Sequence, residues 1–275
     1  MILFPNAKIN LGLNILARRA DGYHDIATVF YPIGWRDALE VVPSRESETG
    51  CRLHLSGMPV DAPVEDNLVV RAYCLLSEMH PLPGVEVYLH KVIPYGAGLG
   101  GGSSDATFMM LLLRDLFSIP VRNDELAASV VHLGADCPFF LYNRPMLAEG
   151  IGDRLSPVEV SLRGYSLVLV KSQVSVSTAE AYSSVTLSRP EKPLSEILSF
   201  PVEKWREMLG NDFERSVFAQ YPLLSHIKQQ LYDLGAIYAS LSGSGSALYG
   251  LFRLVPEEVE RFFPHCQVWT GECAY

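Results

Sequence analysis

Residues 94–106 read Pro-Tyr-Gly-Ala-Gly-Leu-Gly-Gly-Gly-Ser-Ser-Asp-Ala, with five glycines and two serines directly before an apolar helical pattern. Glycine permits positive φ and a close approach of the backbone to a ligand, so consecutive N–H groups can face one anion. A helix expected from Ser104 to Phe117 would direct its own unpaired N–H groups at the same point. Its predicted buried face, set by three- and four-residue spacings, consists of Met109, Met110, Leu113, Leu116 and Phe117. The segment therefore predicts a phosphate-binding loop.

Other glycine-rich loops explain this segment less well. A Walker A loop needs a lysine before its final serine or threonine, and residues 101–104 contain none. Residues 96–101 satisfy a loose G-x-G-x-x-G after a strand-like run at Val85–Leu89, which is weak evidence for a dinucleotide site. A flexible linker is the plain structural alternative, but linkers are not usually placed between a strand and an amphipathic helix.

Length and charge limit the classes of protein to which the chain can belong. At 275 residues it can form one large domain or two closely joined ones with a substantial core. The 22 basic and 31 acidic residues give a net charge of −9 without a basic cluster, which argues against a nucleic-acid partner. The five cysteines lack C-x-x-C spacing and favour a reducing cytoplasm, and no apolar run predicts export or a membrane segment.

The first half of the chain reads as strands followed by helices. A strand is predicted over Ile9–Ile15, with Lys8, Asn10, Gly12 and Asn14 on a polar face. Strands over 25–33 and 38–42 then predict an antiparallel meander, and helices are expected over 66–76 and 124–133. This order lacks regular βαβ alternation and favours an α+β arrangement over a Rossmann-like sheet.

A change in pattern between residues 143 and 157 predicts a domain boundary, placed here between residues 152 and 153. Strands are expected over 165–170, 237–241 and 247–252, and helices over 178–182, 202–208 and 223–234. A surface loop is expected over 188–201, and Ser242–Ser246 forms a second glycine turn. Two lobes with a cleft between them are predicted.

Three separated pieces together resemble the GHMP kinase superfamily: Lys8 and Asn10 on one strand face, the loop over 94–104 and the late turn Ser242–Ser246. Five motifs in order mark one branch of it, namely Ala7–Leu11, Asp21–His24, Asp66–Leu68, the loop that ends at Ala106 and Gly134–Phe140. The resemblance implies an N-terminal ATP-binding domain over 1–152 and a C-terminal acceptor-binding α/β-plait domain over 153–275.

The branch of the superfamily that these motifs most resemble transfers the γ-phosphoryl group of ATP to the 2-hydroxyl of 4-diphosphocytidyl-2-C-methyl-D-erythritol, in the non-mevalonate route to isoprenoid precursors. Magnesium is expected with the ATP, whereas no dedicated set of metal ligands is visible in the sequence. The alternatives are a kinase of another small alcohol, such as mevalonate, homoserine or a sugar, and a catalytically silent nucleotide-binding sensor. A monomer and a homodimer are both compatible with the sequence.

The resemblance assigns catalysis to two charged residues. Asp136 would accept the proton of the acceptor hydroxyl, and Lys8 would stabilise that carboxylate and the negative charge on the transferred phosphate. Taken singly, Lys8 reads equally as a solvated strand residue and Asp136 as a helix cap, because charged side chains are mostly surface features.

The resemblance also assigns the two binding sites. ATP would contact the loop residues Pro94, Gly96, Gly98, Leu99, Gly100, Gly101, Gly102, Ser103 and Ser104. Asn67 would lie near the adenine, although it reads equally as the N-cap of the next helix. The acceptor would contact Asn10, Tyr23, His24, Tyr182, Gly243 and Ser244. Tyr23 would stack on the cytosine, with Tyr182 as the weaker candidate for the opposite face of the base.

Overall fold

The protein is described from a computed structural model, which covers residues 1–44, 50–59, 63–187 and 189–273. These residues divide into two compact units that interleave along the chain. The first unit contains residues 1–7, 35–95 and 100–143, and the second contains residues 8–34, 96–99 and 144–275. The boundary expected at residues 152 and 153 supposes consecutive domains, and it stays a prediction.

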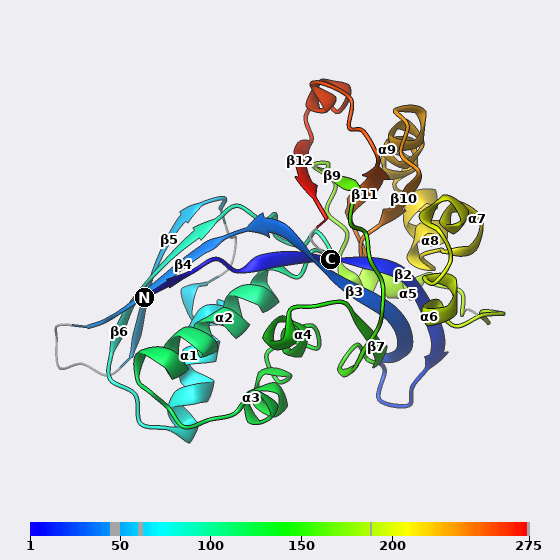
Figure 1. Ribbon diagram of the computed structural model, residues 1–275. Helices are drawn as coiled ribbons and strands as arrows, with labels where there is room; N and C mark the ends of the chain where they lie inside the picture. The colour runs from blue at the N-terminus through cyan, green and yellow to red at the C-terminus, as the bar shows by residue number, and fades with distance from the viewer. Residues whose placement is uncertain (45–49, 60–62, 188, 274–275) are drawn as a thin grey trace. The chain divides into compact units, whose positions relative to one another are not determined.

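The first unit is built on one four-stranded sheet with the order β1-β4-β6-β5 (Figure 1). The strands β1 (Ile2–Leu3), β4 (Ala38–Pro43) and β6 (Val85–Lys91) pair antiparallel, and β5 (Cys51–Gly57) runs parallel to β6. Helices α1 (Leu68–Met79) and α2 (Gly101–Leu116) lie side by side and pack with α3 (Asn123–Val130) and α4 (Cys137–Tyr142). The short helix η1 (Val64–Asp66) precedes α1.

The apolar core of the first unit joins its sheet to its helices. Leu39, Val87 and Leu89 from the strands contact Leu76 and Met109 from the helices, and all five are at most 1% exposed. Alternate residues of β6 are buried, as expected for a strand with one face on the core. Strand β6, in which every second residue is apolar, and the amphipathic helix α2 thus bury their apolar faces in one core. The sequence patterns of both elements predicted them.

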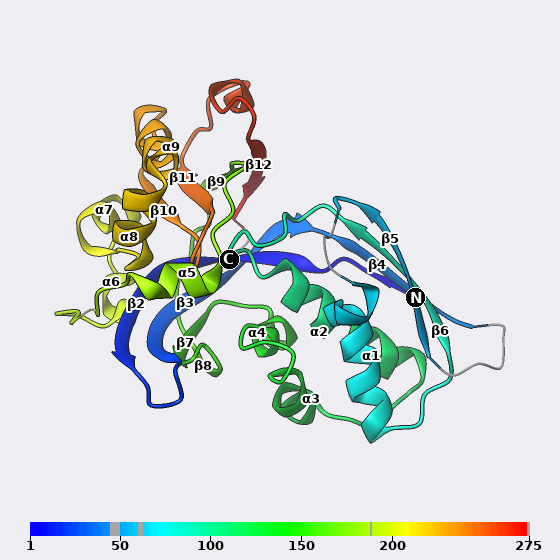
Figure 2. The ribbon, with the colours of Figure 1, turned by 180° about the vertical axis from the view of Figure 1, so that it is seen from behind.

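The second unit contains two further four-stranded sheets (Figure 2). One has the order β2-β3-β7-β8, with long strands β2 (Asn6–Arg18) and β3 (His24–Arg36) beside β7 (Met146–Gly150) and β8 (Arg154–Pro157). The other has the order β10-β11-β9-β12, formed by β9 (Ser166–Lys171), β10 (Tyr238–Leu241), β11 (Ala247–Phe252) and β12 (Gln267–Glu272), and all its pairs are antiparallel.

Short helices cover the second unit. Helix α9 (Pro222–Asp233) packs its buried face on β10 and β11, and α8 (Phe213–Gln220) packs on α9. The remaining helices are α5 (Thr178–Ser183), α6 (Leu194–Ile197), η2 (Val202–Lys204), α7 (Trp205–Met208) and η3 (Val259–Phe262). Across the described ranges, none of the helices combines the length and the apolar character that crossing a membrane requires.

The α+β class is confirmed, with three corrections to the expected elements. The meander is wrong at its third strand, because β4 pairs with β1 and β6 in the first unit and not with β3. The loop expected over 188–201 contains α6, while Ser188 lies outside the described residues. The polar face of β2 is not solvated at its start, because Lys8 and Asn10 are 3% and 2% exposed. Local patterns specify a strand but not the elements that will cover it.

Candidate active site

Strand β2 carries a buried ammonium group on its polar face. The Nζ atom of Lys8 donates hydrogen bonds to Oδ1 of Asn10 (2.8 Å) and to the carbonyl oxygen of Gly98 (3.1 Å), and it lies 4.8 Å from the ring centroid of Phe30. The Nδ2 atom of Asn10 donates in turn to Oγ1 of Thr28 on β3 (2.9 Å). A buried charge is costly unless it is hydrogen-bonded, so these contacts hold the ammonium at one place. Lys8 is therefore not the solvated strand residue that its sequence alone allowed.

The glycine loop has a backbone that only glycine adopts readily. Gly96, Gly98 and Gly100 have φ of 61°, 74° and 69°, in the left-handed region. At Gly98 a Cβ atom would lie 2.0 Å from the carbonyl oxygen of Ser242, so any side chain would clash with backbone. The amide of Lys8 also donates to the carbonyl of Leu99 (2.9 Å). The part of the loop from Gly96 to Leu99 is thus fixed against β2 and the late glycine turn.

The rest of the loop forms the first turn of α2. This helix begins at Gly101, three residues before the predicted start, with Gly100 as its N-cap in the left-handed conformation. The amide of Ser104 donates to the carbonyl of Gly100 (2.9 Å), which leaves the amides of residues 101–103 without intrahelical acceptors. The buried Oγ atom of Ser104 has no hydrogen-bond partner among the described residues. Unpaired donors at a helix N-terminus are the arrangement that binds phosphate.

Asp136 stands beside this helix start in the first unit. It is the N-cap residue of α4, but its side chain makes no capping hydrogen bond. The Oγ1 atom of Thr107 donates to the carbonyls of Ser103 and Cys137, both at 2.9 Å, and so ties α4 to the first turn of α2. Burial raises the pKa of the Cys137 thiol to about 12, which keeps that neighbour neutral. The backbone segment that begins α4 with Asp136 is thus held to the first turn of α2.

Asn67 has the capping role that its position suggested. Its Oδ1 atom accepts a hydrogen bond from the amide of Val69 (3.0 Å) at the start of α1. Pro94 is buried before the loop and Tyr95 is 70% exposed. A role for Asn67 near the adenine stays a prediction.

The late glycine turn of the second unit lies against the glycine loop. The Oγ atom of Ser242 donates to the carbonyl of Gly98 (2.9 Å), the carbonyl that also accepts from Lys8. Gly243 has a φ of 57°, and a Cβ atom there would lie 3.3 Å from Oδ1 of Asn10. Lys8, Asn10, Gly98 and Gly243 are therefore brought together, and Ser244 follows directly in the same turn.

The aromatic residues expected to hold the cytosine lie in two different environments. Tyr23 is 61% exposed at the end of the Asp21–Gly22 turn. The rings of His24 and Tyr182 stack with centroids 4.7 Å apart, and Phe213 packs edge-on against Tyr182 at 4.8 Å. One face of Tyr182 is thus occupied by His24 in this structure, which favours a supporting role for Tyr182 over direct stacking on a base.

A buried charge cluster in the first unit was not predicted. Lys91 forms ion pairs with Asp37 and, at 2.6 Å, with Asp105, which follows Ser104 in α2. Burial, reinforced by the charge of Asp37, raises the pKa of Asp105 to about 7, although Lys91 opposes this shift. Burial lowers the pKa of Lys91, but the two carboxylates outweigh it and raise that pKa above its ordinary value. The cluster anchors α2 to the sheet directly behind the first turn.

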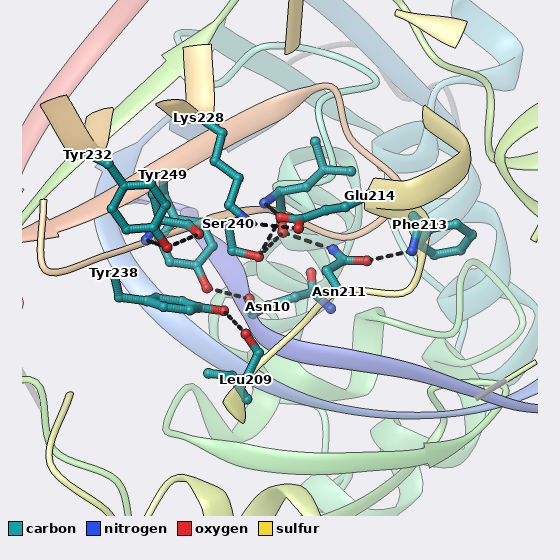
Figure 3. A network of polar contacts seen from close by, with 12 residues as sticks. Asn10, Leu209, Asn211, Phe213, Glu214, Lys228, Tyr232, Tyr238, Ser240 and Tyr249 are labelled. Atoms are coloured by element: carbon teal, nitrogen blue, oxygen red, sulfur yellow. Dashed lines mark hydrogen bonds and ion pairs between the residues drawn. The ribbon is translucent and has the colours of Figure 1, made fainter. Parts of the chain in front are cut away.

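Several polar residues around Lys8 were also missed. Thr28, Asn211 and Tyr249 are buried and hydrogen-bonded around β2 and the late turn. Figure 3 shows Asn211 and Tyr249 with Asn10. Asn211 and Asp212 before a helix could have been read as cap residues. No short-range signal marks Tyr249, whose partner Asn10 is 239 residues away.

Comparisons with known proteins agree with this arrangement. Residues 67–144 match the family model for the GHMP kinases N terminal domain, and residues 194–265 match the model for the GHMP kinases C terminal domain. Both matches assign the chain to the GHMP kinases, which are ATP-dependent phosphotransferases.

The individual proteins that resemble this chain point to one branch of the GHMP kinases. The 4-diphosphocytidyl-2-C-methyl-D-erythritol kinase of Parabacteroides distasonis is 50% identical over 273 residues, which cover 99% of each chain. The Bacteroides fragilis protein of the same name is 53% identical over 258 residues, 94% of this chain and 93% of that one. A crystal structure of 4-(cytidine 5'-diphospho)-2C-methyl-D-erythritol kinase superposes with a TM-score of 0.82 at 33% identity and covers 98% of both chains. The chain belongs to this family of GHMP kinases.

Proposed function

We propose that the protein phosphorylates the 2-hydroxyl of 4-diphosphocytidyl-2-C-methyl-D-erythritol with ATP, giving the 2-phosphate and ADP in the non-mevalonate route to isoprenoid precursors. The observation that carries the proposal is the buried ammonium of Lys8, held at the carbonyl of Gly98 inside the glycine loop. The relatives that share half of the sequence and bear the name of this activity support the choice of acceptor.

Catalysis would use Lys8 and Asp136 as a pair around the transferred phosphoryl group. Asp136 takes the proton from the 2-hydroxyl as that oxygen forms its bond to the γ-phosphorus, and the bond to the β-phosphate oxygen breaks to release ADP. Lys8 stabilises the negative charge on the phosphoryl oxygens and favours the ionised form of Asp136. The hydrogen bonds to Oδ1 of Asn10 and to the carbonyl of Gly98 help to orient the ammonium.

ATP would be bound by the glycine loop. The positive-φ glycines allow the backbone to approach the phosphates closely, and the amides of residues 101–103, which have no intrahelical acceptors, can donate to phosphate oxygens. The Ser104 hydroxyl, which has no hydrogen-bond partner among the described residues, can donate to the same oxygens. Magnesium bound with the nucleotide would neutralise phosphate charge, and it commonly keeps waters and substrate phosphates as ligands. Pro94 and Leu99 would shape the loop, and Asn67 would lie near the adenine.

The acceptor would be bound by the second unit. Tyr23 would stack on the cytosine, and His24, supported by Tyr182, would contact the cytidyl group. Asn10, Gly243 and Ser244 would line the site of the polyol, since Asn10 and Gly243 adjoin the Lys8 ammonium. Three of these six residues, Asn10, Tyr23 and His24, belong to the N-terminal segment of the second unit, and the other three lie within residues 153–275.

The surroundings of the enzyme are part of the same proposal. All five cysteines are free, which fits a reducing compartment and supports a cytoplasmic location. The net charge of −9 and the small-molecule site support small-molecule partners over nucleic acid. A monomer and a homodimer remain the two candidate assemblies.

A coupled assay of ADP release tests the proposed function. Purified protein with ATP and magnesium is offered 4-diphosphocytidyl-2-C-methyl-D-erythritol, mevalonate, homoserine or galactose. We expect ADP with the cytidyl acceptor alone. Background ADP with that acceptor would overturn the proposal, and turnover of one of the other three would reassign the acceptor.

A further inference from the structure

Asn211 lies between β2 and the late glycine turn and uses its whole side-chain amide. It is 5% exposed, and its Nδ2 atom donates to the carbonyls of Leu241 and Gly243, both at 2.9 Å. Its Oδ1 atom accepts from the amide of Phe213 (3.0 Å) at the start of α8 (Figure 3). One amide group therefore fixes the carbonyls on both sides of Ser242.

The residues around Asn211 are themselves tied to β2. The amide of Leu13 donates to the carbonyl of Gly210 (2.9 Å), and the amide of Asp212 donates to the carbonyl of Leu13 (2.9 Å). The Oδ2 atom of Asp212 also accepts from the amide of Ile15 (2.7 Å). Asn211 is thus placed by the same strand that carries Lys8.

The turn that Asn211 holds reaches the Lys8 ammonium through one carbonyl group. Ser242 Oγ and Lys8 Nζ both donate to the carbonyl oxygen of Gly98, at 2.9 and 3.1 Å. An ammonium has three N–H donors, so fixing two of them, on Gly98 and Asn10, sets the direction of the whole group. The direction therefore depends on the placement of the Gly98 carbonyl.

A second support reaches Lys8 through Asn10. The hydroxyl of the fully buried Tyr249 on β11 donates to the backbone carbonyl of Asn10 (2.8 Å). The Oδ1 atom of Asn10 accepts from Lys8 (2.8 Å). Tyr249 thus helps to position Asn10, whereas Ser242 holds the Gly98 carbonyl.

We infer that Asn211 is a positioning residue for phosphoryl transfer, because its amide fixes the Ser242 turn that shares the Gly98 carbonyl with Lys8. The inference rests on the proposed function, in which Lys8 acts on the transferred phosphoryl group. Asn211 itself touches neither substrate, and it acts through Ser242 and Gly98. A displacement of about 1 Å at a positioning group can cost on the order of 100-fold in rate.

Two substitutions break this chain of contacts at different points. Asn211→Asp keeps an oxygen that accepts from the amide of Phe213, but it turns a carboxylate oxygen toward two carbonyls, so the turn loses its donor. Ser242→Ala removes only the hydroxyl that donates to Gly98. Tyr232→Phe is the matched control, because it deletes two hydrogen bonds to Ala239 on the neighbouring β10 without touching the turn.

The experiment measures kcat, both KM values and thermal stability for these variants and for the double variant of Asn211 and Ser242. We expect kcat to fall about 10- to 100-fold in each single variant, with the KM for ATP within about threefold and little further loss in the double variant. Asn211→Asp should regain part of its kcat relative to wild type as the pH falls from 8 to 6, because a protonated carboxyl can donate to one carbonyl again.

The outcomes separate the two proposals. Single-variant kcat values within about twofold of Tyr232→Phe, or fully multiplicative losses in the double variant, would overturn the role of Asn211. If Asn211→Asp does not fold, Ser242→Ala is the remaining test. An unchanged kcat in that variant is then enough to overturn the role of Asn211. A wild-type protein without ADP release would instead overturn the proposed function, and the positioning role with it.

Discussion

The Nζ atom of Lys8 and the carbonyl oxygen of Gly98 lie 3.1 Å apart, which joins a buried cation on β2 to the middle of the glycine loop. These residues are 90 positions apart in the chain, yet each is held by further contacts of its own. The loop is therefore more than a set of backbone donors, since it also carries an acceptor that orients a positive charge. If Lys8 acts on the transferred phosphoryl group as proposed, this pairing gives the loop a direct part in placing the charge.

Removing the ammonium should remove most of the activity. We expect Lys8→Met to lower kcat by about 100- to 1,000-fold, the usual cost of losing one electrostatic contact to the transition state. Methionine retains an apolar stem over Phe30, so the melting temperature checks that the fold survives. Lys192→Met is the control, because Lys192 pairs with Glu196 at the surface and should leave kcat within about twofold. Equal losses in the two variants would contradict the role of Lys8.

Asp136→Asn should separate chemistry from nucleotide binding. Losing a general base costs about 100- to 10,000-fold in kcat, whereas the ATP affinity should stay within about threefold. The melting temperature checks that the fold survives the substitution at this N-cap position of α4. Single-turnover kinetics and calorimetry with a non-hydrolysable ATP analogue measure the two quantities, with the exposed Asp233→Asn as control. A parallel loss of ATP affinity would place Asp136 at the nucleotide instead.

The stacked pair His24 and Tyr182 predicts a graded effect on the acceptor. Tyr182→Phe keeps the ring that supports His24 and should leave the KM for the cytidyl acceptor within about twofold, whereas Tyr182→Leu should raise it about 3- to 10-fold. The KM for ATP should not move in either variant. Steady-state kinetics with each substrate varied in turn measures both constants. A large effect of Tyr182→Phe would show that the hydroxyl, and not the stack, is what the acceptor needs.

The glycine loop could be predicted from the sequence because its signals are local. Glycines at 96, 98 and 100 have positive φ, as their density suggested, and an amphipathic helix follows them. The helix start was placed three residues late, because glycine has low helix propensity and masks a first turn that the cap at Gly100 and the packing of α2 nevertheless stabilise.

The supports of the site could not be predicted in the same way. Hydrogen bonds such as Tyr249 to Asn10 and Asn211 to Gly243 join residues 239 and 32 positions apart, and no periodicity encodes such a pairing. The burial of Lys8 also depends on contacts between distant parts of the sequence. Alternation predicted which face of β2 is polar, whereas the glycine loop and the late turn determine whether that face is exposed to solvent. Strand β4 likewise follows β3 in the chain but pairs in another sheet.

The buried cluster of Lys91, Asp37 and Asp105 predicts a pH dependence of stability. The pKa of Asp105 is raised from its ordinary value of 3.8 to about 7, so the folded state keeps a proton that the unfolded state releases as the pH rises above about 4. The free energy of unfolding therefore falls as the pH rises from about 4 to 7, by at most roughly 1 kcal/mol per pH unit from this group. In urea denaturation at pH 4.5, 5.5, 6.5 and 7.5, wild type should lose stability relative to Asp105→Asn with each step, while the exposed Asp115→Asn follows wild type. Lys91 stays charged throughout, since its own pKa is raised, and cannot supply that slope. Parallel curves for wild type and Asp105→Asn would mean that Asp105 is already ionised at pH 4.5, and that its ion pair with Lys91 outweighs burial.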